Sequence, residues 1–345
     1  MIDKAGQKGA FILGRNVTQF EKEAARYIGT RHAIGVANGT DALMLSLRAL
    51  GIGKGDRVIT TPWTFFATAE VISEVGAKPV FVDIEPGSFC IDPEQIKKKI
   101  TKTTKAIMPV HIFGHPANMD AIRALADEHG LAVIEDAAQA FGAKAGRQRV
   151  GGIGDTGCFS FYPTKVLGCY GDGGLIATNS DELDEHIRRL RNHGASAPFM
   201  HEEIGYNSRL DEVQAALLRL KLKGMNMMLD VRKRIADYYD EHLDGLDLKT
   251  PPRPEQGSHA FNLYTIRSFQ RDTIREAFAE HKIGHSICYP VPLHLQKVYE
   301  YLKYKPGSLP VAETASKEVI SLPIYHGMSQ EQAAQVCEVI RDAIG

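Results

Sequence analysis

Residues 57–83, "RVITTPWTFFATAEVISEVGAKPVFVD", contain two short apolar segments with a helix-like segment between them. The outer segments, "RVITT" and "KPVFVD", are typical of buried strands, and "ATAEVISEVG" is typical of a helix that ends at Gly76. The same alternation of strand and helix patterns extends over residues 17–165. Because strands that are apolar throughout must be covered on both faces, the pattern predicts an α/β fold with a mostly parallel sheet between helices.

The length of the chain and one proline-rich segment predict two domains. A chain of 345 residues exceeds what one hydrophobic core usually supports. The segment "KTPPRPEQG" at residues 249–257 is the best linker candidate, and one strand pattern and two helix patterns follow it. We predict a large domain over residues 1–245 and a smaller C-terminal α/β domain over residues 246–345.

The balance of charge and the cysteine pattern argue against several classes of partner. The chain has 41 basic and 42 acidic residues, without a basic stripe for nucleic acid or a basic amphipathic segment for a membrane surface. Its five cysteines form no CxxC pair, and His111 and His115 of "HIFGH" have no further ligand at metal-binding spacing, so no metal is predicted. Residues 1–15 contain no apolar core long enough for a signal peptide, and we expect a cytoplasmic protein.

Ligands of open α/β sheets collect beyond the carboxyl ends of the strands, and three such ends carry unusual residues. At "ANGTDAL" (37–43) a strand ends at Ala37 and a helix begins near Thr40. Gly39 lets the backbone approach a ligand, and a helix N-terminus offers unpaired N–H groups, a combination that suits a phosphate. The motif also suits a helix cap by Asn38 or Thr40, and taken alone it favours the cap.

The second strand end is "LAVIEDAAQA" (131–140), where Asp136 follows an apolar strand. An unpaired carboxylate there is costly to desolvate, so Asp136 needs a cation or several hydrogen-bond donors. Gln139 follows three residues later and can contact the same ligand if the turn is tight. A helix cap by Asp136 fits this motif equally well.

The third strand end lies in "FSFYPTKVLGCYGDGG" (159–174), where Lys165 is the only Lys or Arg between Arg149 and Arg188. Pro163 places Lys165 on a loop. A lysine in a dry site has a lowered pKa, and its neutral amine is a nucleophile toward a carbonyl, although a surface position is the default for a single lysine. Together, a phosphate cradle, a buried carboxylate and a lone lysine are what pyridoxal phosphate needs.

With these motifs in order, the chain resembles the nucleotide-sugar aminotransferases of the DegT/DnrJ/StrS family from about Phe11 to Tyr325. The motifs that carry the resemblance are "NGTDAL", "PWTFFATA", "PVHIFGHPANMDAI", "VIEDAAQAFGA", "FSFYPTKVLG", "GDGG", "RNHG", "GYNSRLDEVQAA" and "YPVPLHLQ". The resemblance implies fold type I with a seven-stranded sheet in the large domain, pyridoxal 5'-phosphate as cofactor, and a homodimer.

The resemblance also implies roles for individual residues. Lys165 would bond to the cofactor aldehyde and later carry the proton between the substrate carbon and the cofactor carbon. Asp136 would pair with the pyridinium N–H, Gln139 would hydrogen-bond the 3-oxygen of the ring, and Phe65 would stack on the ring. The phosphate would be held by Gly39, Thr40, Ser160 and, reaching across from the other subunit, Asn207.

Residues near the substrate are assigned less firmly by the motifs. The family places Tyr289, His294 and His193 near the substrate, but each is equally compatible with a surface or packing role. Arg209 suits a carboxylate or diphosphate, and equally a salt bridge to an acidic neighbour. Trp63 is expected to be a packing residue.

The reaction that the resemblance implies is an amine transfer in ping-pong order. Glutamate gives its amino group, and a keto sugar linked to a nucleotide takes it, making an amino sugar for a surface polysaccharide or a glycosylated metabolite. The form "FYPTK…GDGG" is more similar to enzymes that act at sugar carbon 3 than at carbon 4. The alternatives are a non-catalytic regulator that binds pyridoxal phosphate on the same fold, a sugar dehydratase, which would have histidine in place of Lys165, and an oxidoreductase, which would need a G-x-G-x-x-G turn.

Overall fold

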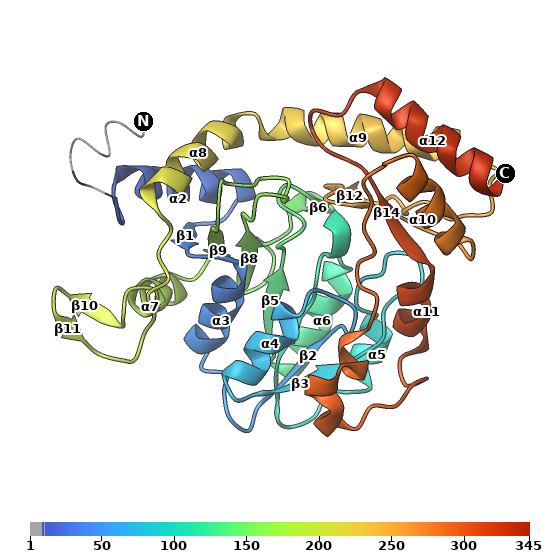
Figure 1. The fold of residues 1–345 in the computed structure, drawn as a ribbon. Coiled ribbons are helices and arrows are strands. Elements are labelled where there is room, and N and C mark those ends of the chain that lie inside the picture. Colours follow the sequence, from blue (N-terminus) through green and yellow to red (C-terminus); the bar gives the residue numbers. More distant parts are fainter. Residues whose placement is uncertain (1–8, 10) are drawn as a thin grey trace.

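A seven-stranded sheet forms the centre of the computed structural model, which describes residues 9 and 11–345 (Figure 1). β9 is antiparallel to β1 and β8, and the pairs β8–β5, β5–β4, β4–β2 and β2–β3 are parallel, which confirms the predicted sheet. The order of strands is β1 (His32–Val36), β9 (Gly174–Thr178), β8 (Thr156–Ser160), β5 (Ala132–Asp136), β4 (Thr104–Met108), β2 (Arg57–Thr60) and β3 (Lys78–Phe81).

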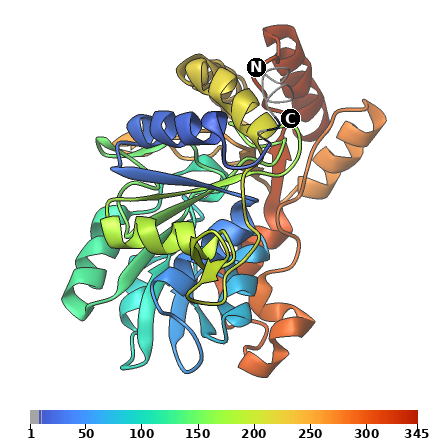
Figure 2. The ribbon, with the colours of Figure 1, turned by 90° about the vertical axis from the view of Figure 1, so that its left-hand side faces the viewer.

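Both faces of the sheet are buried. Side chains of successive residues in a strand point to opposite faces, and here they pack in different apolar clusters. In β5, Ile134 packs in one cluster with α3 (Gly39–Ala49) and α4 (Ala67–Glu74), whereas Val133 packs in another with α6 (Met119–His129). Figure 2 shows α2 (Arg15–Ile28) and α7 (Asp181–Leu190) on opposite sides of the edge strand β1. The short helix α5 (Pro93–Lys97) follows β3.

The helical region expected between Leu210 and Leu243 consists of two helices, α8 (Glu212–Lys223) and α9 (Met225–His242), which meet at Gly224. The carboxylate of Glu212 accepts hydrogen bonds from the N–H groups of Asn16 (2.9 Å) and Val17 (2.8 Å). It thereby satisfies the free N-terminus of α2, on which α8 packs.

The C-terminal unit contains a two-stranded antiparallel sheet of β13 (Tyr264–Arg267) and β14 (Val319–Leu322) with helices α10 (Arg271–Glu280), α11 (Pro310–Glu318) and α12 (Gln330–Ile344) (Figure 1). Ile235 and Tyr239 of α9 belong to the apolar cluster of this unit. Residues before position 245 therefore pack with the C-terminal unit. The domain boundary at residue 245 stays a prediction. Two 3-10 helices, η2 (Leu293–Leu295) and η3 (Lys297–Leu302), lie between α10 and α11.

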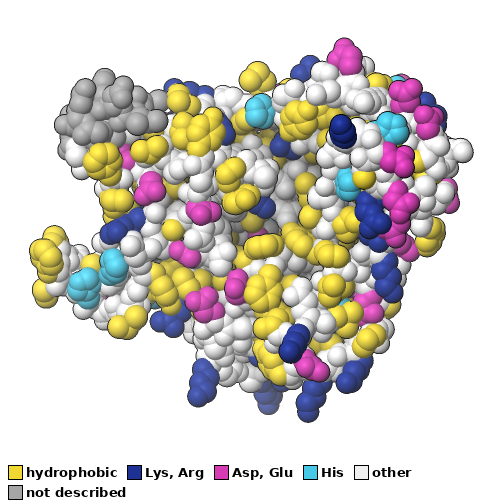
Figure 3. Space-filling model, viewed as in Figure 1, with side chains coloured by type: hydrophobic (Ala, Val, Ile, Leu, Met, Phe, Trp, Pro, Cys, Tyr) yellow, Lys and Arg dark blue, Asp and Glu magenta, His cyan; other side chains and the backbone are white. Residues whose placement is uncertain are grey.

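Small elements outside the central sheet were not expected from the sequence. A hairpin of β10 (Ala195–Ala197) and β11 (Met200–His201) projects from the body of the molecule (Figure 1), and Figure 3 shows apolar side chains at its end. There Phe199 is 96% and Met200 63% exposed. The remaining elements are η1 (Ile112–Gly114) and a small sheet of β12 (Gly257–Ser258), β6 (Lys144–Ala145) and β7 (Gln148–Arg149).

The fold does not test the expected absence of a signal peptide or the expected cytoplasmic location. Most of residues 1–15, where no signal peptide is expected, lie outside the described residues. Within residues 9 and 11–345, none of the helices has the length and apolar character needed to cross a membrane. The cytoplasmic location stays a prediction.

Candidate active site

A cavity of about 800 Å³ lies at the carboxyl ends of the parallel strands. The segments that follow β1, β2, β4, β5 and β8 line it from the central sheet, and Cys288 and Tyr289 line it from the C-terminal unit. This is the place where open α/β sheets bind their ligands. The predicted site residues that line it are Gly39, Thr40, Phe65, Asp136, Gln139, Ser160, Lys165 and Tyr289.

Asp136 is the last residue of β5, and its side chain is almost fully buried. Its Oδ2 accepts a hydrogen bond from the Thr68 hydroxyl at 2.7 Å, and its Oδ1 accepts one from the N–H of Ala138 at 3.2 Å. Burial raises the pKa of Asp136, while these two donors and the charge of Lys165 partly lower it. No helix follows Asp136, so the helix cap that its motif also suited does not form. The carboxylate retains lone pairs for a further donor in the cavity.

Lys165 lies on the loop between β8 and β9, as the sequence predicts. Its N–H donates to the carbonyl of Tyr162 at 2.9 Å. The loop is tight, because a Cβ on Gly168 would come within 2.6 Å of the carbonyl oxygen of Pro163. Burial lowers the pKa of the Lys165 amine, and the charge of Asp136 partly raises it. More of this amine is therefore neutral at a given pH than in an exposed lysine, which favours attack on an aldehyde.

The segments after β1 and β8 meet in a cradle that suits an anion. The Asn38 side chain accepts the N–H of Asp41 at 2.8 Å and caps α3, so the cap and the predicted phosphate site involve neighbouring residues. A Cβ on Gly39 would come within 2.7 Å of the Cβ of Ser160, so only glycine allows this approach. The start of α3, at Gly39 and Thr40, and Ser160 border the cavity with the donors that a phosphate needs.

Gln139 joins the two units across the cavity. Its Oε1 accepts the N–H of Phe113 at 2.7 Å, and its Nε2 donates to the hydroxyl of Tyr289 at 2.9 Å. One N–H of the amide and the hydroxyl proton of Tyr289 thus remain for a ligand. The carbonyl of Tyr289 accepts the indole N–H of Trp63 at 2.9 Å, and Trp63 is fully buried, in keeping with its expected packing role. Phe65 lines the cavity and is 58% exposed, available to cover a flat ligand.

Four residues with expected roles lie outside the lining of this cavity. Asn207 and His193 are exposed at the base of the β10–β11 hairpin. His294 is 2% exposed and is bonded at 3.0 Å to a carboxylate of α11. Arg209 donates to Asn192 at 3.1 Å. The roles of these residues toward phosphate or substrate stay predictions.

Three residues of the site, Thr64, Thr68 and Cys288, were not expected from the sequence. Thr64 and Cys288 line the cavity, and Thr68 holds Asp136. The two threonines are four residues apart in "PWTFFATA", a spacing that brings side chains together at a helix start. Cys288 comes from the C-terminal unit and directly precedes Tyr289, whose predicted place near the substrate is the signal that could have found it.

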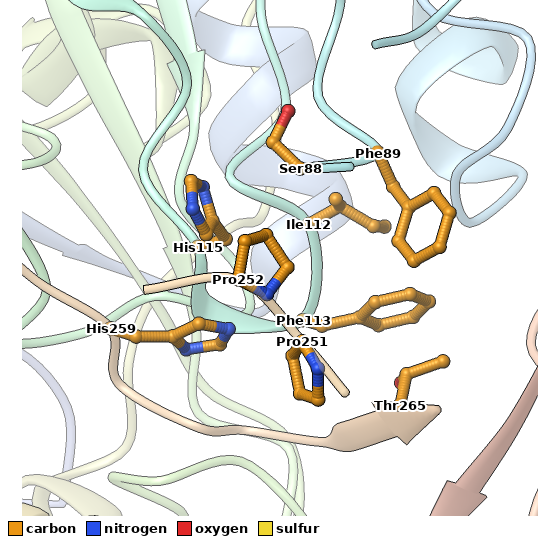
Figure 4. A pocket seen from close by; sticks show the side chains of 9 residues that line it. All are labelled: Ser88, Phe89, Ile112, Phe113, His115, Pro251, Pro252, His259 and Thr265. Atoms are coloured by element: carbon orange, nitrogen blue, oxygen red, sulfur yellow. The ribbon is translucent and has the colours of Figure 1, made fainter. Parts of the chain in front are cut away.

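The histidines of "HIFGH" have structural partners. His111 is fully buried: its Nε2 donates to Glu135 at 2.9 Å, and its Nδ1 accepts the N–H of Ala117 at 3.0 Å. His115 lies beside His259 in a small crevice, where the rings meet edge to face at 5.4 Å (Figure 4). Within residues 9 and 11–345, no group of three or more potential metal ligands occurs.

We expect acid to destabilise the fold by protonating the two histidines of this crevice, His115 and His259. Burial lowers the pKa of His115 from 6.5 to about 4 and also lowers the pKa of His259. Both folded-state values lie below the unfolded value, so the stabilisation is complete above pH 6.5 and is lost as the pH falls toward about 4. The loss from His115 is up to about 3 kcal/mol. Urea unfolding across this range measures it, and His115→Asn should flatten the pH dependence; an unchanged slope contradicts the assignment.

These groups fit pyridoxal phosphate. The cradle at Gly39 and Ser160 suits the phosphate, the buried carboxylate of Asp136 suits a protonated ring nitrogen, and the amine of Lys165 suits the aldehyde. The fold and the cavity together define a pyridoxal-phosphate enzyme on an α/β fold.

Comparisons with known proteins agree with this class. The sequence matches the model of the DegT/DnrJ/EryC1/StrS aminotransferase family over residues 1–341. It is 47% identical over 345 residues to a pleiotropic regulatory protein of Geobacillus stearothermophilus (99% of this chain, 93% of that protein). It is 46% identical over 340 residues to the UDP-N-acetyl-3-dehydro-alpha-D-glucosamine 3-aminotransferase of Acidithiobacillus ferrooxidans (99% and 92%). The structure of S. venezuelae DesV in complex with a ketimine intermediate has a TM-score of 0.97 at 42% identity, over 99% of this chain and 92% of that one.

The chain belongs to the DegT/DnrJ/EryC1/StrS aminotransferase family. It is a sugar aminotransferase that depends on pyridoxal phosphate, and the predicted family, fold type I class, enzyme class and cofactor are confirmed.

Proposed function

We propose that this enzyme moves the amino group of glutamate to the keto group at carbon 3 of a nucleotide-linked sugar. The observation that carries the proposal is the placement of Lys165 and Asp136 in one cavity at the strand ends. The carbon-3 choice is supported by the "FYPTK…GDGG" form and by the A. ferrooxidans relative, whose name describes a 3-aminotransferase of a UDP-linked 3-dehydro sugar. The product is an amino sugar for a surface polysaccharide or a glycosylated metabolite.

The residues of the cavity divide the work of this transfer. Bound pyridoxal phosphate supplies an aldehyde that reacts with amines and a ring that withdraws electrons. Lys165 would provide the amine that holds the aldehyde, and once released it would take the proton from the donor carbon and deliver it to the cofactor carbon. Asp136, ionised, keeps the ring nitrogen protonated. Gly39, Thr40 and Ser160 would hold the phosphate, Gln139 would donate to the ring oxygen, and Phe65 would cover the ring.

A panel of substrates tests this proposal. The protein is incubated with glutamate and UDP- or dTDP-linked 3-keto and 4-keto sugars, and 2-oxoglutarate and amino sugar are measured by mass spectrometry. We expect transfer to 3-keto sugars at least about 10-fold faster than to 4-keto sugars. The reverse preference contradicts the carbon-3 proposal. A protein that binds the cofactor but ignores every amino donor would instead be a regulator, the alternative that the name of the G. stearothermophilus relative favours.

We also propose that the active unit is a homodimer in which Asn207 reaches the partner's phosphate site. Among the residues that line the cavity of one chain are three carboxylates, of Asp41, Asp136 and Asp172, and one cation, Lys165, although all its ligands are anions. A second chain would supply further donors. The projecting hairpin, with Asn207 at its base, presents apolar surface suited to such a partner.

Phe199→Asp should weaken the dimer, because the apolar tip of the hairpin would then carry a charge into the interface. We expect the dissociation constant of the dimer to rise at least about 10-fold, with loss of bound cofactor. Light scattering after size exclusion measures the mass. Phe269→Asp is the matched control, since Phe269 is 83% exposed on the C-terminal unit. A Phe199→Asp protein that stays dimeric and fully loaded contradicts the proposal.

A further inference from the structure

We propose that Thr68, oriented by Thr64, is a positioning residue that holds the carboxylate of Asp136 in its ionised form for the cofactor. The inference rests on the cofactor, and not on the identity of the sugar or of the amino donor. Neither threonine touches the reacting atoms in this scheme, and both act through Asp136.

The geometry forms a short chain of hydroxyl groups that ends at the carboxylate. The Oγ1 of Thr68 lies 2.7 Å from Oδ2 of Asp136, and the Oγ1 of Thr64 lies 3.0 Å from that of Thr68. Thr68 is fully buried in the first turn of α4, and Thr64 is 2% exposed on the loop before it, where it also lines the cavity. Water therefore does not compete for these bonds.

The direction of the bonds depends on the charge of Asp136. Each hydroxyl has one proton, and an ionised carboxylate only accepts. Thr68 must then give its proton to Asp136 and accept one from Thr64, so the two threonines point the same way. Donation to an ionised acceptor is roughly twice as strong as donation to a neutral one, and linked bonds strengthen each other. The chain of hydroxyls thus favours the ionised carboxylate.

This support matters because burial has the opposite effect on Asp136. Burial raises the pKa of Asp136, and the Thr68 hydroxyl is the strongest of the groups that lower it. Without that hydroxyl, Asp136 takes up a proton at higher pH and no longer holds a protonated ring nitrogen. The other titratable groups that face Asp136 are Lys165, His111, Tyr289 and Cys158.

The test compares Thr68→Val with Thr68→Ser in the full-length protein purified with its cofactor. After equilibrium dialysis against a fixed concentration of pyridoxal phosphate at several pH values, the bound cofactor is measured by absorbance. We expect Thr68→Val to weaken cofactor retention about 10-fold. The pH below which the cofactor is lost should also be higher in Thr68→Val. Thr68→Ser should behave as the parent protein.

Thr60→Val is the matched control, because Thr60 is a fully buried threonine of β2 whose hydroxyl donates to the carbonyl of Met108 at 2.8 Å. It should retain the cofactor normally. Unchanged retention in Thr68→Val, or equal losses in Thr60→Val, would overturn the proposal. If Thr68→Val does not fold, Thr64→Val decides: it should weaken retention about 3-fold, and no change there also overturns the proposal.

Discussion

Replacing Lys165 by alanine should lower the rate of amine transfer by about 1,000-fold or more. The variant loses both the amine that holds the cofactor aldehyde and the base that carries the proton. The fold should persist, because the side chain lines a cavity and is not part of an apolar cluster. Formation of 2-oxoglutarate from glutamate in a single turnover, with circular dichroism as the check on folding, measures the effect.

Lys165→Arg is the control for charge. Arginine keeps the cation but stays protonated at any working pH, so it can neither attack the aldehyde nor accept a proton. We expect this variant to be as inactive as Lys165→Ala. Activity within about 10-fold of the parent in either variant contradicts the role of the neutral amine.

Asp136→Asn should lower the rate of amine transfer by about 100-fold or more. Asparagine fills the same space and can still accept the hydrogen bond of Thr68, but it has no charge with which to keep a ring nitrogen protonated. Asp136→Glu, which keeps the charge, should retain more activity than Asp136→Asn. Equal rates in the two variants would show that charge is not what this position contributes.

The same substitution should also shift the pH dependence of Lys165. The charge of Asp136 raises the pKa of the Lys165 amine, against the larger lowering by burial. Removing that charge therefore lowers the pKa of the Lys165 amine further. The reactivity of this amine toward an aldehyde rises as it loses its proton, and this rise should begin at lower pH. The rate of pyridoxal phosphate addition to Asp136→Asn across a pH series measures this; a shift to higher pH is the contrary result.

The sequence predicted the sheet well because its strands are continuously apolar and its turns carry clear signals. Val133 and Ile134 of β5 illustrate the reason: both are buried, on opposite faces, so apolar residues follow one another along the strand. Asp136 could be found because a charged residue at the end of such a strand is conspicuous, and Lys165 because no other Lys or Arg occurs between Arg149 and Arg188.

What the sequence could not predict depends on distant or weak signals. Tyr289 reaches Gln139 across 150 positions of sequence, a contact that only the folded chain defines. The β10–β11 hairpin is short and exposed, without the apolar alternation that marks a buried strand. The break between α8 and α9 at Gly224 could not be predicted, because it depends on tertiary packing: α8 packs on α2, and α9 packs on the C-terminal unit.

The most direct test of the central claim is chemical. The protein with bound cofactor is reduced with borohydride and digested, and the peptides are analysed by mass spectrometry. We expect the reduced cofactor on the peptide that contains "FSFYPTKVLG", attached to Lys165, and none after prior incubation with glutamate. Attachment at a different lysine, or no attachment in a protein that transfers amine normally, would contradict the account.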